Sequence, residues 1–295
     1  MRNGIVTSQQ AENYIAYKAA LRKLCDSADE TSPFQNTVVE ELDSRYGYGF
    51  ALRHALRHCV STEFVCVIQH DRSFMRPTPI QEAVDTMWNH PNIKYIGMSM
   101  RSNLMYRDHF QGKYGNVYMD DFDRLCLRPP ELVVDASKFG PDSESTRAMA
   151  YPSGALKENI ESFSEAYRIS KQYAAYQQWL DNLPQPLPPN NHQMSLTPTF
   201  FWFDNVHIAE TAHYRDFVFN PRYKMVARGG FVEDKLSPVI KKTVERLGLV
   251  DGHSRFGCYL LDDHSGMFFT GHLDGGSYIT EATRKEILDS QKTTR

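Results

Sequence analysis

The sequence lacks several features that would assign it to a familiar class. It has no apolar run approaching the roughly 20 residues that span a bilayer, and residues 1–25 lack the apolar core of a signal peptide. Its five cysteines are scattered without CxxC spacing, which argues against a zinc knuckle or a disulfide framework and favours a reducing compartment. Neither a GxGxxG motif nor a P-loop is present, so a dinucleotide-binding or ATPase assignment has no support. We therefore expect a cytoplasmic protein without a membrane span.

Charge of one sign is not in excess either. The formal net charge is -3, with 33 basic and 36 acidic residues, which argues against a nucleic-acid partner bound by bulk electrostatics. A chain of 295 residues that is 41% hydrophobic and 12% aromatic has enough apolar content for a compact core. We expect a single domain over residues 1–295, with residues 1–100 forming one half and residues 101–295, including a C-terminal tail, forming the other.

One stretch organises the rest of the chain. Residues 64–68 form a short apolar run typical of a strand buried on both faces, and Gln69, His70, Asp71 and Arg72 follow it directly. In open α/β sheets, ligands bind beyond the carboxyl ends of strands. A carboxylate at that position can hold a hard divalent cation, and the cation can hold a diphosphate. The alternative is that Asp71 only caps a turn and His70 only fills a loop.

The segment before this strand predicts a βαβ unit. Residues 37–42 favour a strand, Gly47 and Gly49 form a turn, and residues 50–59 return to helical periodicity before the apolar run. The two glycines allow the start of that helix to approach another group closely. Nearer the N-terminus, apolar residues at helical spacing predict an amphipathic helix over residues 9–27.

Further along the chain, three more segments are expected. Residues 93–100 predict a strand, residues 155–182 have helical composition, and residues 196–205 form an apolar run expected to be a strand that ends in Asp204. His207 follows shortly after that run.

A second acidic site follows a glycine turn. Gly229 and Gly230 precede Glu233 and Asp234, which we expect at the N-terminus of a helix continuing over residues 235–247. Acidic residues there also favour the helix dipole, which is the simplest explanation of the pair. Transfer from a nucleotide sugar requires three parts that this sequence offers. They are a carboxylate after a strand, a second acidic pair, and a late histidine, His272 or His264.

These segments together resemble a known family. The order of elements over residues 36–71 is similar to the glycosyltransferase A fold, in its inverting, family 2-like group. The family's Asp-x-Asp metal motif corresponds to Gln69-His70-Asp71, which retains the last acid. Residues 231–234 resemble the later Glu-Asp motif, which makes Asp234 the general base and Glu233 its neighbour. His272 matches a further metal ligand of some members.

The resemblance implies a fold and a function. We expect an α/β protein with a mixed, mainly parallel sheet flanked by helices in a Rossmann-like three-layer sandwich, in which residues 1–100 hold the donor and metal. The expected activity is metal-assisted transfer, with inversion, from a nucleotide-diphosphate sugar to a glycan or other hydroxyl acceptor. The implied cofactor is Mn²⁺ or Mg²⁺, bound by Asp71 and His272. The implied donor-binding residues are Gln69, His70, Asp71, Arg72, Gly47 and Gly49, and the acceptor-binding residues are Trp202, Asp204 and His207.

The sequence also departs from the family pattern. Gln69 replaces the first acid of the metal motif, and the QxxRW signature of processive synthases is absent, which argues against a polymer synthase. Residues 4–8 are a poor first strand, so we expect either a different mode of base binding or a chain that lacks the family's N-terminal strands. A non-catalytic sugar-binding or scaffolding domain of the same fold is the main alternative. A metal phosphohydrolase built on His70-Asp71 is a weaker one, and His54 with His58 is better explained as a solvated helix face.

Overall fold

The computed structural model describes residues 7–100, 103–146, 171–183 and 186–272. The chain divides into two compact units, Met1–Tyr46 and Gly47–Arg295. Within the described ranges, no helix is both long enough and apolar enough to cross a membrane.

The first unit contains one long helix. Helix α1 (Ser8–Asp26) confirms the helix predicted for residues 9–27, and a capping box between Thr7 and Gln10 fixes its start. Glu41 forms ion pairs with both Lys18 and Arg22 of this helix. The strand predicted for residues 37–42 is wrong, because this segment has no regular structure. Its β-branched composition favours an extended chain, but a strand also needs a neighbour to pair with its backbone groups.

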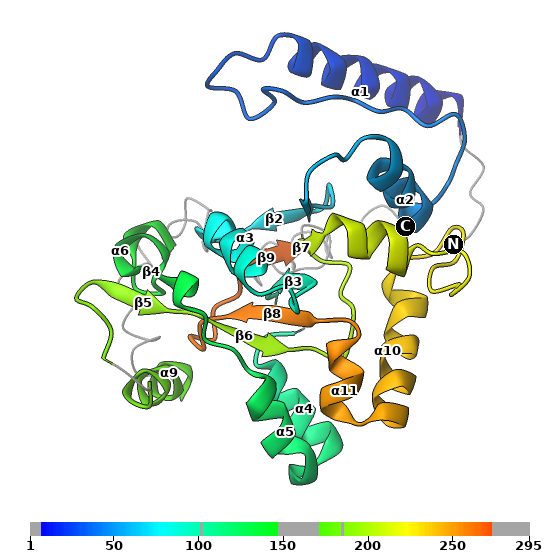
Figure 1. The fold of residues 1–295 in the computed structure, drawn as a ribbon. Coiled ribbons are helices and arrows are strands. Elements are labelled where there is room, and N and C mark those ends of the chain that lie inside the picture. Colours follow the sequence, from blue (N-terminus) through cyan, green and yellow to red (C-terminus); the bar gives the residue numbers. More distant parts are fainter. Residues whose placement is uncertain (1–6, 101–102, 147–170, 184–185, 273–295) are drawn as a thin grey trace, which may run out of the picture. The chain divides into compact units, whose positions relative to one another are not determined.

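The second unit holds the sheets and the remaining described helices (Figure 1). Its elements, in chain order, are α2 (Tyr48–His58), β1 (Phe64–Val67), β2 (Arg72–Phe74), α3 (Ile80–Asn89), β3 (Tyr95–Met98), α4 (Tyr106–Tyr114), η1 (Asn116–Tyr118), α5 (Met119–Leu125), η2 (Pro130–Leu132), β4 (Val133–Asp135), α6 (Ala136–Phe139), α9 (Lys171–Asp181), β5 (Asn191–Gln193), β6 (Ser195–Pro198), β7 (His207–Glu210), η4 (His213–Val218), α10 (Glu233–Leu247), α11 (Leu249–Ser254), β8 (Cys258–Asp262) and β9 (Thr270–His272). The strands predicted for residues 64–68 and 93–100 and the helix at residues 235–247 are confirmed as β1, β3 and α10. Of the helix predicted for residues 155–182, residues 155–170 lie outside the described part of the chain.

The main sheet has five strands in the order β1-β7-β3-β8-β6. The expected α/β class is confirmed, but the expectation of a mainly parallel sheet is wrong for the described strands. Strands β3 and β8 are parallel, whereas β1–β7, β3–β7 and β6–β8 are antiparallel. The reason is that β7 lies between β1 and β3 and runs opposite to both. Two smaller sheets, β2–β9 and β4–β5, complete the described strands.

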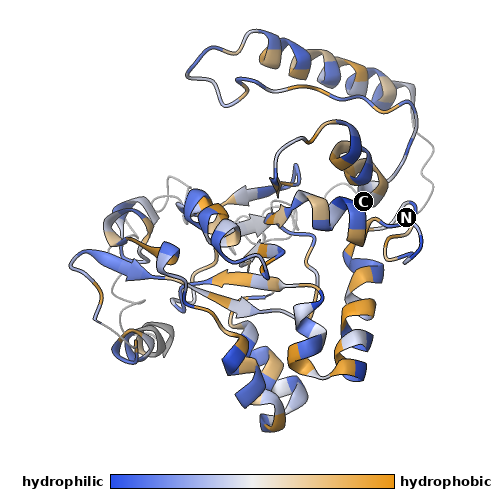
Figure 2. Cartoon of the chain, in the orientation of Figure 1, coloured by the Kyte–Doolittle hydropathy of each residue, from blue (hydrophilic) through white to orange (hydrophobic). Residues whose placement is uncertain are grey.

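Each face of the main sheet has its own core. Tyr95 lies opposite Ala209 and Cys258 in the register, and all three pack into a cluster with α2, α10 and α11. Ile96 lies opposite Ile208, and because side chains alternate along a strand, both point to the other face of the sheet and pack against α3. Figure 2 shows apolar residues recurring in the central strands and along α10. Helices therefore cover both faces of the sheet, so ligands are expected at its edge.

The strand directions bring several loops to one edge. Strands β1, β3 and β8 run in the same direction, so their carboxyl ends lie at the same edge of the sheet, where β7 begins. The predicted strand over residues 196–205 is too long, because β6 ends at Pro198. The Thr199 hydroxyl accepts a hydrogen bond from the Phe201 N–H, at 3.2 Å, and turns the chain out of the sheet. Asp204 consequently lies in the loop that enters β7.

Candidate functional site

A polar cavity of about 390 Å³ lies at this edge of the sheet. Its polar lining residues are Gln69, Asp71, Arg72, Asp204, Asn205 and Glu233, and its apolar lining residues are Met100, Phe201, Phe203 and Phe231. They come from the segments that follow β1 and β3, the loop before β7 and the start of α10. The structure therefore places the two predicted acidic motifs, more than 150 residues apart in the sequence, around one cavity.

The strand-end motif is tied to the β6–β7 loop. Gln69 donates its side-chain amide to the backbone oxygen of Asp204 at 2.6 Å, so this side chain links two walls of the cavity. Arg72 approaches the Met100 sulfur at 3.5 Å, and its buried Nε has no hydrogen-bond partner among the described residues. Arg72 itself lines the cavity, and a guanidinium at a cavity wall is suited to an anionic ligand such as a phosphate.

Asp204 and Glu233 hold each other through two hydrogen bonds. The Asp204 N–H donates to Glu233 Oε2 at 3.0 Å, and the Glu233 N–H donates to Asp204 Oδ2 at 2.9 Å. Burial raises the pKa of Asp204 to about 7, although the hydrogen bond from the Glu233 backbone lowers it, and the nearby Glu233 charge adds to the increase. Asp204 is only 3% exposed. Its two hydrogen bonds with Glu233 fix the start of α10 against the β6–β7 loop.

The remaining predicted metal and catalytic residues are placed differently. His70 and Asp234 are both exposed and are not among the residues that line the cavity. The Asp234 carboxylate instead accepts the Phe231 N–H at 2.9 Å. The backbone of His272 lies opposite Arg72 in the β2–β9 pair, which brings it next to the segment that carries Asp71. The register therefore places the two predicted metal ligands on neighbouring segments.

Two residues predicted to bind the acceptor belong to the core. Trp202 and His207 are fully buried, and both pack against Tyr95, with ring centroids 4.4 Å and 4.9 Å from it. Burial lowers the pKa of His207 to about 4, so its imidazole is neutral. Neither side chain lines the cavity, because the alternation along residues 201–204 turns Phe201 and Phe203 toward it and Trp202 inward.

The predicted donor-binding glycines pack against the second glycine turn. An added Cβ at Gly47, which has φ +76°, would lie 2.5 Å from Gly229 Cα, and the Gly49 N–H donates to the Gly230 oxygen at 3.1 Å. The group that these glycines approach closely is therefore the backbone that leads into Glu233. Neither glycine lines the cavity.

Gly47→Ala should consequently destabilise the fold by about 3 kcal/mol, because a left-handed conformation and a backbone clash act together. Gly229→Ala is the matched control. It has φ +80° but nothing within 4 Å of an added Cβ, so it should cost only about 1 kcal/mol. Urea unfolding of both variants measures the difference, and equal losses would show that the clash is relieved.

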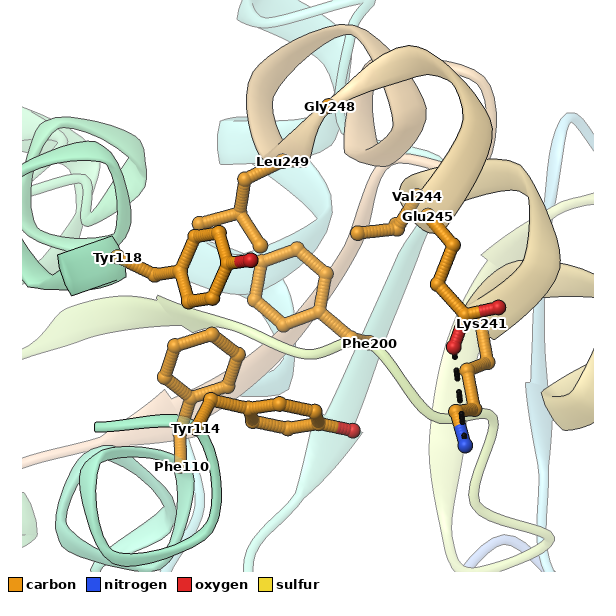
Figure 3. A pocket seen from close by; sticks show the side chains of 9 residues that line it. All are labelled: Phe110, Tyr114, Tyr118, Phe200, Lys241, Val244, Glu245, Gly248 and Leu249. Carbon is orange, nitrogen blue, oxygen red and sulfur yellow. Dashed lines mark ion pairs between the residues drawn. The ribbon is translucent and has the colours of Figure 1, made fainter.

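A second cavity has a different character (Figure 3). Its volume is about 270 Å³, and the rings of Phe110, Tyr114, Tyr118 and Phe200 surround it together with Val244 and Leu249. Its charged groups are Lys241 and Glu245, which pair with each other at 3.7 Å on the exposed side of α10. The lining of this second cavity is mostly apolar, whereas the polar cavity is lined by the carboxylates that acid–base or metal-assisted reactions require.

Met100, Asn205 and Phe231 are among the lining residues that the sequence did not single out. Met100 is the last residue of the predicted strand 93–100, and a position just past a strand end was the available signal. Asn205 follows Asp204 directly, and it lines the cavity because β6 already ends at Pro198 and leaves both residues in the loop before β7.

Comparison of the chain with protein-family models, curated proteins and solved structures gives no match.

Proposed function

We propose that the protein is a glycosyltransferase that moves a sugar from a nucleotide-diphosphate donor to an acceptor hydroxyl with inversion. The observation that carries the proposal is the convergence of Asp71, Arg72 and Glu233 on one polar cavity at the carboxyl ends of β1 and β3. A transferase of this kind needs a carboxylate for the donor's metal, a cation for the diphosphate and a second carboxylate for the acceptor.

The donor set suits a hard divalent cation. Carboxylate oxygens are the ligands that Mg²⁺ and Mn²⁺ prefer, and Asp71 supplies one at the cavity. Asp71 would hold the ion with His272, whose backbone lies opposite Arg72. When bound, the cation would neutralise charge on the leaving diphosphate. Arg72 would contact the same diphosphate, and Gln69 would keep the β6–β7 loop in place.

The acceptor side of the cavity combines aromatic and acidic groups. Phe201 and Phe231 are 40% and 39% exposed, so their rings offer apolar surface beside Glu233. That combination suits a sugar or another polyhydroxyl molecule, whose ring stacks on an aromatic face while its hydroxyls bind carboxylates.

Calorimetric titration with a panel of nucleotide sugars, with and without Mn²⁺, tests the proposal. We expect metal-dependent binding of one donor, and release of its nucleoside diphosphate when an acceptor is added. Binding of free sugar without any donor turnover would instead favour a non-catalytic sugar-binding domain. No binding across the panel would contradict the transferase assignment.

A further inference from the structure

The two acids at the start of α10 have different surroundings. Glu233 lines the polar cavity, whereas Asp234 is exposed outside its lining. Asp234 Oδ2 accepts the Phe231 N–H at 2.9 Å and lies 3.1 Å from the position of an added Cβ at Gly230. Asp234 therefore closes the turn that leads into the helix, as a capping residue does.

Two hydrogen bonds to Asp204 hold Glu233 in place. Its Oε2 accepts the Asp204 N–H at 3.0 Å, and its own N–H donates to Asp204 Oδ2 at 2.9 Å. Asp204 is fixed in turn by Gln69, which donates to its backbone oxygen at 2.6 Å. A carboxylate that reaches a cavity and is supported by a buried neighbour has the preorganisation that proton transfer requires.

We infer that Glu233, and not Asp234, takes the proton from the attacking acceptor hydroxyl, and that Asp204 is its positioning residue. The inference rests on the proposed transferase function. The acceptor proton passes to the Glu233 carboxylate while the acceptor oxygen forms a bond to the anomeric carbon of the donor. The bond from that carbon to the diphosphate oxygen breaks, and its electron pair leaves with the nucleoside diphosphate.

The matched pair Glu233→Gln and Asp234→Asn tests the assignment on adjacent residues. We expect Glu233→Gln to lower kcat by about 10²- to 10⁴-fold, the usual contribution of a general base, with metal-dependent donor affinity unchanged. Asp234→Asn keeps an oxygen that can accept the Phe231 N–H and should turn over at close to the wild-type rate. Glu245→Gln, in an exposed pair on the same helix, controls for removal of a charge from α10.

Chemical rescue separates a base from a structural carboxylate. Glu233→Ala leaves space beside the acceptor, and added formate should restore part of its transfer rate in proportion to formate concentration. The same formate should not restore Asp204→Ala, in which the support of Glu233 is lost. Asp204→Asn, which keeps an oxygen for the Glu233 N–H, should retain most of kcat, so the two Asp204 variants should differ in kcat at equal donor affinity.

Each outcome decides the assignment. Loss of turnover in Asp234→Asn with activity kept in Glu233→Gln would overturn it and make Asp234 the base. Formate that fails to rescue Glu233→Ala, despite normal donor binding, would also overturn it. A wild-type protein that binds no donor, or that binds a donor and transfers nothing, would overturn the proposed function itself. Normal transfer by the wild type together with full turnover in Glu233→Gln would overturn this inference alone.

Discussion

Asp71→Ala is expected to abolish metal-dependent binding of the donor. Asp71 is the carboxylate that follows β1 into the polar cavity, and alanine leaves no oxygen there for a divalent cation. We expect donor affinity in the presence of Mn²⁺ to fall by about 100-fold or more, which corresponds to about 2.7 kcal/mol. Calorimetric titration with and without Mn²⁺ measures this, and the remaining weak binding should no longer depend on the metal.

The control for this variant is Asp251→Asn, which removes an exposed carboxylate from α11 and should leave donor affinity unchanged. Far-ultraviolet circular dichroism should show the same secondary structure in both variants. If Asp71→Ala bound the donor as tightly as the wild type does with Mn²⁺, Asp71 would not be the metal ligand.

The largest loss of stability is expected for Asp263→Asn. Asp263 forms a buried ion pair with Arg76, whose side chain is fully buried and has no hydrogen-bond partner for its Nε and Nη1 among the described residues. The Arg76 guanidinium also lies 3.9 Å from the centroid of the Phe269 ring. Asparagine keeps the shape of the side chain and leaves the buried cation without its counter-charge. Removing one partner of such a pair should cost about 3–5 kcal/mol in the free energy of unfolding.

Asp123→Asn provides the contrast. Asp123 pairs with Arg107 at 2.7 Å, but both side chains are more than 40% exposed, so this loss should stay below about 1 kcal/mol. Urea unfolding compares the two variants directly. Similar losses at both sites would mean that water reaches Arg76 and that its burial is not maintained in solution.

The same ion pair predicts a dependence of stability on pH. Although burial alone would raise the pKa of Asp263, the charges of Arg76 and His192 lower it below its ordinary value. The unfolded chain therefore binds this proton at a higher pH than the folded protein does. The stabilisation is complete above the ordinary carboxyl value and is lost as the pH falls through the pKa of the folded state. Asp263→Asn should remove this part of the acid sensitivity.

Local patterns predicted the elements that carry much of the site. The apolar run before Gln69 became β1, and the acid pair after the glycine turn became the start of α10. These predictions held because an abrupt change from apolar to polar residues and the start of a helical period are properties of neighbouring residues. The strand predicted for residues 37–42 was wrong for the opposite reason. A strand needs a neighbouring strand to pair with, and the sequence of the segment does not specify whether one is present.

The sequence by itself determined that Asp71 closely follows a strand and that Glu233 and Asp234 lie at the head of a helix. Tertiary structure alone decided the rest. Strand β7 inserts between β1 and β3, which makes the sheet largely antiparallel and brings the loop carrying Asp204 to the cavity. It also decided that Glu233 lines the cavity while Asp234 caps a turn, because adjacent residues at a helix start point in different directions. Side-chain direction relative to distant segments is a property of packing, and no local pattern encodes it.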